Sequence, residues 1–171
     1  PEDMGIGYGL RRLVAERARS AREAVEIAGA LIEEFGYTSG RSYQFCDKNE
    51  AWVFQIPTGR RYVAKRIPDD HVYMIPNNYT IHEVDFADTE HKNCYFSKDL
   101  VEYAMKNGWY QPAVPGDYSD FDFARAYQDG PDKVHNLIRA RQTWPMLLGE
   151  RPEEWRPFSR KAPRKYTVAE L

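Results

Sequence analysis

The chain has 171 residues, which is enough for one domain with a buried core. Its hydrophobic fraction of 42% and aromatic fraction of 14% exclude disorder over most of the length and indicate a globular protein. The 24 basic and 26 acidic residues leave a net charge of -2, so we expect no nucleic acid or membrane partner. No apolar run approaches the roughly 20 residues of a membrane span. Cys46 and Cys94 lie outside any CxxC spacing and do not identify the cellular compartment. We expect the protein to be cytoplasmic.

The first half of the chain predicts a helix followed by strands. Apolar residues recur at mostly three- and four-residue intervals from Leu10 to Phe35, the pattern of a single amphipathic helix. Turn-rich segments then separate three predicted strands and a fourth extended segment, at 42–46, 51–56, 62–67 and 72–75. Short connections between successive strands favour an antiparallel meander with the helix packed on one face, an α+β fold.

The second half predicts helices separated by irregular segments. Ser97 is a good N-cap for a helix over 98–107, and Pro131 suits the first turn of another that runs to about residue 143. Residues 109–130 combine Pro, Gly and aromatics, which is typical of an ordered loop. We expect a single partial domain, with a core segment over 1–145 and an extended Pro- and Arg-rich tail over 146–171 that ends in the first turn of a helix at 168–171.

Most candidate chemical motifs have a simpler structural explanation. GxSxG, HExxH, Walker and GxGxxG signatures are missing from the sequence. The glycines of 5–9 are better explained as a helix entry than as a phosphate loop, because no strand leads into them. His82, His91 and Cys94 have the atom types of zinc ligands but not a standard spacing, so we expect no metal. Residues 69–71 favour a turn over an acid–base cluster.

The segment Pro76–Thr80 is more informative. Asn77 and Asn78 place two adjacent carboxamides after an apolar strand, where burial requires hydrogen-bond partners. A fixed amide NH₂ at that place could donate to a developing oxyanion. A strand-ending Asx turn explains the same letters, and on these five residues alone it is the stronger of the two interpretations.

Several runs of the sequence together resemble the dipeptidase A type of cysteine dipeptidase. The resemblance covers nearly the whole chain in the same order, and it is carried by EAWV within 47–53, YVAKRIPDD at 62–70, IPNNYTI at 75–81, SKDLV at 97–101, GWY at 108–110 and FDFARAY at 121–127.

This resemblance implies an N-terminal-nucleophile (Ntn) hydrolase fold, a four-layer αββα sandwich, acting on dipeptides without a cofactor. In that family an N-terminal cysteine attacks the peptide carbonyl, and its own α-amino group serves as the base. The resemblance implies that Asn77 is an oxyanion donor and that Asn78 and Tyr79 lie close to the substrate. It thereby shifts the balance for Asn77 from the turn to the functional interpretation.

The family's nucleophile has no counterpart in this chain. Cys46 is internal and has no free α-amino group, so it cannot take that role. We therefore expect an internal fragment that is inactive alone and depends on a missing N-terminal segment or a companion chain. The alternative is a non-catalytic Ntn-fold domain for binding or assembly. A truncated sandwich is also expected to expose apolar surface and to form a homo-oligomer through it.

Overall fold

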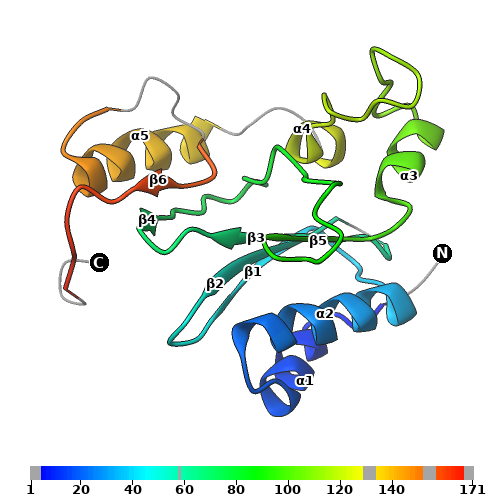
Figure 1. The fold of residues 1–171 in the computed structure, drawn as a ribbon, viewed down its shortest axis with the longest axis horizontal. Coiled ribbons are helices and arrows are strands. Elements are labelled where there is room, and N and C mark those ends of the chain that lie inside the picture. The colour runs from blue at the N-terminus through cyan, green and yellow to red at the C-terminus, as the bar shows by residue number, and fades with distance from the viewer. Residues whose placement is uncertain (1–4, 58, 129–133, 152–156, 168–171) are drawn as a thin grey trace.

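The computed structural model describes residues 5–57, 59–128, 134–151 and 157–167. Its centre is a four-stranded antiparallel sheet in the order β1–β2–β3–β5, formed by β1 (Arg41–Cys46), β2 (Ala51–Ile56), β3 (Val63–Ile67) and β5 (Cys94–Phe96). Helices α1 (Gly9–Arg17) and α2 (Ala21–Phe35) cover one face of this sheet (Figure 1). The expected α+β class with an antiparallel sheet is confirmed.

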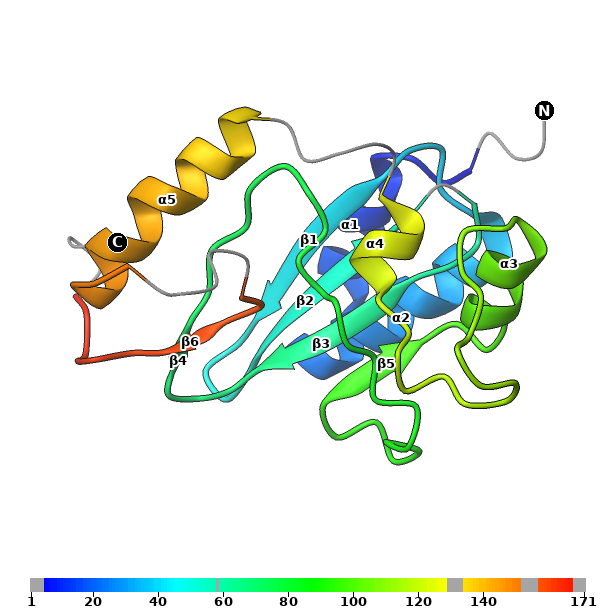
Figure 2. The same cartoon turned by 90° about the horizontal axis from the view of Figure 1, so that it is seen from above.

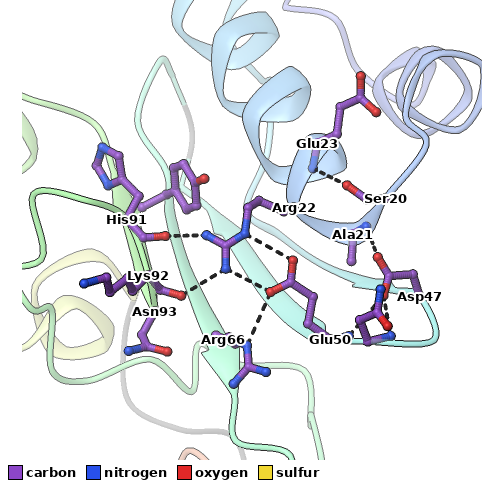
Figure 3. Close-up of polar contacts among 12 residues, drawn as sticks. Ser20, Ala21, Arg22, Glu23, Asp47, Glu50, Arg66, His91, Lys92 and Asn93 are labelled. Atoms are coloured by element: carbon purple, nitrogen blue, oxygen red, sulfur yellow. Dashed lines mark hydrogen bonds and ion pairs between the residues drawn. The ribbon is translucent and has the colours of Figure 1, made fainter.

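The expectation of one continuous helix over Leu10–Phe35 is wrong, because the chain breaks between α1 and α2. Ala18 adopts extended backbone with ψ of 141°, and Ser20 caps α2 by accepting a hydrogen bond from the Glu23 amide at 3.1 Å. The Glu23 carboxylate in turn accepts from the Arg19 amide at 2.7 Å (Figure 3 draws the Ser20 bond). This arrangement is similar to a capping box, except that the carboxylate binds the amide of the residue before the N-cap, and it starts a helix. Both helices bury their apolar faces in the same core, so the periodicity continues across the break.

The fourth strand of the main sheet is β5, so the assignment of 72–75 to the meander is also wrong. Residues 71 and 72 form β4 (His71–Val72), which pairs with β6 (Arg160–Lys161) in a separate two-stranded sheet. An irregular segment then crosses the sheet before the chain returns in β5, as the green trace in Figure 2 shows. Part of the predicted extended tail therefore supplies a strand.

The helices of the second half differ from expectation at their ends. Helix α3 (Leu100–Lys106) begins after Asp99 and not at a Ser97 cap, because the Ser97 hydroxyl instead accepts from the Tyr62 amide at 3.0 Å. The predicted loop over 109–130 contains a short helix, α4 (Phe123–Tyr127), and the helix expected to end near 143 is α5 (Val134–Leu148). Pro131 and the helical turn expected at 168–171 lie outside the described residues.

Two cores lie on opposite sides of the sheet, because side chains of a strand point alternately to its two faces. Trp52 and Phe54 of β2 pack in the core shared with α1 and α2. Val53 packs in the second core with Ile81 and Phe123. Gln55 shares the face of Val53 and is completely buried. The sheet therefore holds the segment around residue 80 on the side opposite the first two helices.

A polar cluster joins α2, the sheet and the loop before β5 (Figure 3). Arg22 pairs with Glu50 at 2.9 Å, donates to the carbonyl oxygen of His91 at 2.5 Å, and lies 4.9 Å from the centroid of the Trp52 ring. Glu50 also accepts from Arg66 at 3.3 Å. One carboxylate in the turn before β2 thus connects α2 with β3.

Candidate functional site

A pocket of about 450 Å³ lies between β1 and the segment after β4. That volume falls within the usual range of small-molecule sites. The three residues predicted for the site, Asn77, Asn78 and Tyr79, all line it. The other lining residues are Gly40, Arg41, Ser42, Gln44, Ile75, Pro76 and Gln128. The fold thus combines the first strand of the sheet, the predicted Asn-Asn-Tyr segment and a residue from the end of α4 in one polar cavity.

Gln55 fixes the segment that carries these residues. Its amide oxygen accepts from the backbone amides of Thr80 at 3.1 Å and Ile81 at 3.0 Å. Its NH₂ group donates to the hydroxyls of Ser42 and Thr80, both at 3.1 Å. These four bonds use both donors and both lone pairs of the carboxamide. The sequence interpretation missed this residue, although a glutamine within the apolar strand AWVFQI was a usable signal.

Tyr79 forms a rigid wall of the pocket. Its hydroxyl donates to the carbonyl oxygen of Ile56 at 2.8 Å, and its amide donates to the side chain of Gln128 at 2.9 Å. Burial raises the pKa of Tyr79 to about 12, so the phenol remains a donor at neutral pH. Gly40 leaves room for this ring, because a Cβ there would stand 2.5 Å from the Tyr79 hydroxyl oxygen.

The two asparagines differ in their surroundings. Asn77 is exposed and lines the pocket. Asn78 is half-buried and donates from Nδ2 to the carbonyl oxygen of Tyr79 at 3.1 Å, and its Oδ1 is buried with no partner in the described part of the chain. Asn77 is therefore the more accessible carboxamide for a ligand in the pocket.

The two histidines weighed as metal ligands have other partners. His82 pairs with Asp122 at 2.9 Å, and His91 stacks on Tyr95 while its ring bonds the carbonyl oxygen of Cys94 at 2.9 Å. Within 5–57, 59–128, 134–151 and 157–167, no group of three or more His, Cys, Asp or Glu side chains could hold a metal ion. The same ranges contain no helix with the length and apolar character to cross a membrane.

The remaining alternatives are turns and a helix entry. The His71 amide donates to the carbonyl oxygen of Pro68 at 3.0 Å, which closes a turn over 68–71. Gly7 has a positive φ of 55° and accepts from the Leu10 amide at 3.2 Å, so it leads into α1.

Neither cysteine is activated for attack. Cys46 is exposed, but partial desolvation, followed by the nearby Asp47 carboxylate, raises the pKa of its thiol. Burial raises the pKa of the Cys94 thiol to about 11. A nucleophilic cysteine needs the opposite shift, because the thiolate is the reactive form. The pocket-lining residues include neither thiol.

Comparison with known proteins identifies the family. The profile of peptidase family C69 matches residues 2–171. The chain belongs to this family. It is 29% identical over 165 residues to "Probable dipeptidase" of Latilactobacillus sakei, covering 93% of the chain and 33% of that protein. It is also 29% identical over 179 residues to "Dipeptidase" of Bifidobacterium longum, covering 93% of the chain and 32% of that protein. It is 33% identical over 124 residues to "Probable dipeptidase" of Salmonella dublin, covering 71% of the chain and 27% of that protein.

The expected resemblance to cysteine dipeptidases is thereby confirmed at the level of the C69 family. The chain spans about a third of the length of the curated relatives it matches.

Proposed function

We propose that this chain supplies the oxyanion-donor wall of an Ntn-type cysteine hydrolase that cleaves dipeptides. The observation that carries the proposal is the meeting of Asn77, Asn78 and Tyr79 on one pocket of ligand size, in a chain of peptidase family C69. The names of the relatives as dipeptidases support dipeptides as the substrate class.

In the proposed reaction a cysteine thiolate attacks the carbonyl carbon of the dipeptide, and the carbonyl oxygen becomes an oxyanion. The Asn77 NH₂ group donates to that oxygen, which stabilises charge that is present only after the attack has begun. Collapse of the tetrahedral intermediate breaks the C–N bond, and the departing amine takes a proton from the α-ammonium group of the nucleophile. Water then hydrolyses the thioester. Asn78 and Tyr79 form the substrate wall beside the reacting carbonyl.

The nucleophile in this proposal lies outside the 171 residues. Support comes from Cys46 and Cys94, whose raised thiol pKa values and positions away from the pocket suit neither for attack. The chain alone would then be inactive. A preceding segment or a companion polypeptide would bring the cysteine to Asn77.

The αββα sandwich is part of the same proposal. Helices α1 and α2 form a layer on one face of the four-stranded sheet, which matches one α layer and one β layer of the four (Figure 1). The other two layers would come mostly from the remaining polypeptide.

The test is Asn77→Ala in the full-length gene product with dialanine as substrate. We expect kcat to fall about 100- to 1000-fold with little change in KM, as for removal of one oxyanion donor. Asn107→Ala is the matched control, since this asparagine donates to the carbonyl oxygen of Tyr103 at the end of α3 and does not line the pocket.

Two outcomes would contradict the proposal. A kcat of Asn77→Ala close to that of the control would remove Asn77 from the reaction. A full-length product that hydrolyses no dipeptide would favour the non-catalytic alternative, an Ntn-fold domain for binding or assembly.

A further inference from the structure

The charge of the pocket is set by one residue. Among the described residues that line it, Arg41 is the only one with a formal charge, and the others are polar amides, a hydroxyl, a phenol, glycine and apolar groups. One cation and no carboxylate among the described lining residues favour a ligand that carries a negative group.

The charge of Arg41 is not neutralised within the described part of the chain. Its Nη2 donates to the Tyr8 hydroxyl, and its guanidinium carbon lies 5.0 Å from the centroid of the Tyr8 ring. In the described ranges Arg41 forms no salt bridge, and its Nε has no hydrogen-bond partner. By contrast, Arg22 and Arg61 each pair with a carboxylate. Arg41 therefore keeps donors and charge for a further acceptor.

We propose that Arg41 binds the free α-carboxylate of the dipeptide and so limits substrates to peptides that end one residue after the scissile bond. This inference rests on the proposed function, because it assigns the second polar end of the same substrate. The planar guanidinium matches a carboxylate with two parallel hydrogen bonds, which a lysine ammonium does not offer.

A dipeptide needs its scissile carbonyl and its carboxylate bound in one pocket. Its terminal carboxylate follows the scissile bond by one Cα, and consecutive Cα atoms are about 3.8 Å apart. Asn77 and Arg41 line the same pocket from different segments, the one after β4 and the start of β1. A third residue added to the peptide would place an uncharged amide where the carboxylate binds.

Tyr8 is assigned as a positioning residue. It is 64% exposed, and it contacts Arg41 through both its ring and its hydroxyl. Arg11 lies over the same ring at 5.7 Å but does not line the pocket, which makes it a matched control for charge and for contact with Tyr8.

The experiment compares dialanine with dialanine amide in the full-length gene product. Arg41→Gln is expected to raise KM for dialanine about 10- to 100-fold, the range for losing a hydrogen-bonded charged partner, and to leave KM for the amide within about twofold. Arg41→Lys is expected to fall between the wild type and Arg41→Gln. Arg11→Gln should preserve the preference for the free acid.

An equal effect of Arg41→Gln on both substrates, or no effect on dialanine, would overturn the inference. Calorimetric binding of a reduced-bond dialanine isostere, as free acid and as amide, keeps the test independent of catalysis. If no dipeptide is hydrolysed but Arg41 still selects the free acid, the proposed function fails and the carboxylate site stands. If hydrolysis depends on Asn77 but binding ignores the carboxylate, only the Arg41 assignment fails.

Discussion

Gly40 has no side chain where the Tyr79 hydroxyl needs space. An added Cβ would stand 2.5 Å from that oxygen, closer than real Cβ contacts. Gly40→Ala would therefore push the ring out of place and weaken its hydrogen bond to Ile56. We expect a loss of about 1–3 kcal/mol in the free energy of unfolding, typical of overpacking.

A double-mutant cycle that combines Gly40→Ala with Tyr79→Phe tests this contact. Removing the hydroxyl costs about 1 kcal/mol for a buried hydrogen bond but also removes the atom that the new methyl group would meet, so the double variant should lose less than the sum of the two single variants. Gly9→Ala is the control, because its Cβ would meet only Ile6 at 4.0 Å. Additive losses in chemical denaturation would contradict the steric explanation.

At the level of single elements, Asp122 connects α4 to the segment after the pocket. It caps α4 by accepting from the Arg125 amide at 2.8 Å, and its carboxylate pairs with His82 at 2.9 Å. Burial alone would raise its pKa, but the hydrogen bonds from His82 and Arg125 outweigh burial and lower it. The charged form therefore stabilises the folded chain above the usual carboxyl pKa, and this contribution is lost as pH falls through the lowered value.

Asp122→Asn keeps the capping oxygen and removes the charge. We expect the variant to be less stable than the wild type at pH 7, and the difference to shrink as pH falls below about 4 because the wild-type carboxyl then becomes neutral. Asp122→Ala should lose about 1 kcal/mol more at every pH, since it also loses the cap. The measurement is urea denaturation from pH 7 to pH 3, and a difference that stays constant with pH would refute the assigned role of the charge.

Regular patterns predicted the elements that local sequence determines. The β1–β3 hairpins were predictable because turn residues bound short apolar runs, and each strand pairs with its neighbour in sequence. The break at Ala18 was missed because apolar residues on both sides enter one core. The pairing of β4 with β6 could not be predicted from local sequence, because it joins residues 71–72 with 160–161 and depends on the tertiary fold.

The candidate site shows the same limit. The letters of Asn77–Tyr79 alone favoured a turn, and the segment was assigned to the site only through the family resemblance. The pocket also includes Gln128, which reaches Tyr79 across 49 positions of sequence. Gln55 was missed because a strand pattern classifies residues only as apolar or polar. It does not predict that a buried side-chain amide will bind the backbone of a segment about 25 residues away.

At the scale of the whole molecule, the large exposed apolar side chains among the described residues lie on helices and loops. Phe35 is 47% exposed on α2, and Ile138 and Met146 are 48% and 83% exposed on α5. The two faces of the main sheet instead contribute to the two cores. The homo-oligomer expected from the sequence stays a prediction, and these helices are the surfaces through which it would form.

The cluster around Glu50 holds the helical layer, the sheet and the loop before β5 together (Figure 3). Glu50 is only 14% exposed, and in Glu50→Gln Arg22 would lose its carboxylate partner while Arg66 would keep only its pair with Asp69. We expect the free energy of unfolding to fall by about 1.5–3 kcal/mol, the range for hydrogen bonds to charged groups. Glu16→Gln is the matched control, because its pair with Arg12 is exposed at 53% and 82% and contributes about 0–1 kcal/mol.

Hydrogen exchange tests whether Glu50 connects the helical layer to the loop before β5. Because Arg22 also donates to the carbonyl oxygens of His91 and Lys92, its release in Glu50→Gln should increase hydrogen exchange both at the start of α2 and in the loop over 91–93. A purely local role for Glu50 would raise exchange only in the turn before β2. The opposite result would be a loss of unfolding free energy in Glu50→Gln as small as in Glu16→Gln, with unchanged hydrogen exchange in the loop over 91–93. It would show that the two apolar cores hold the layers together without this carboxylate.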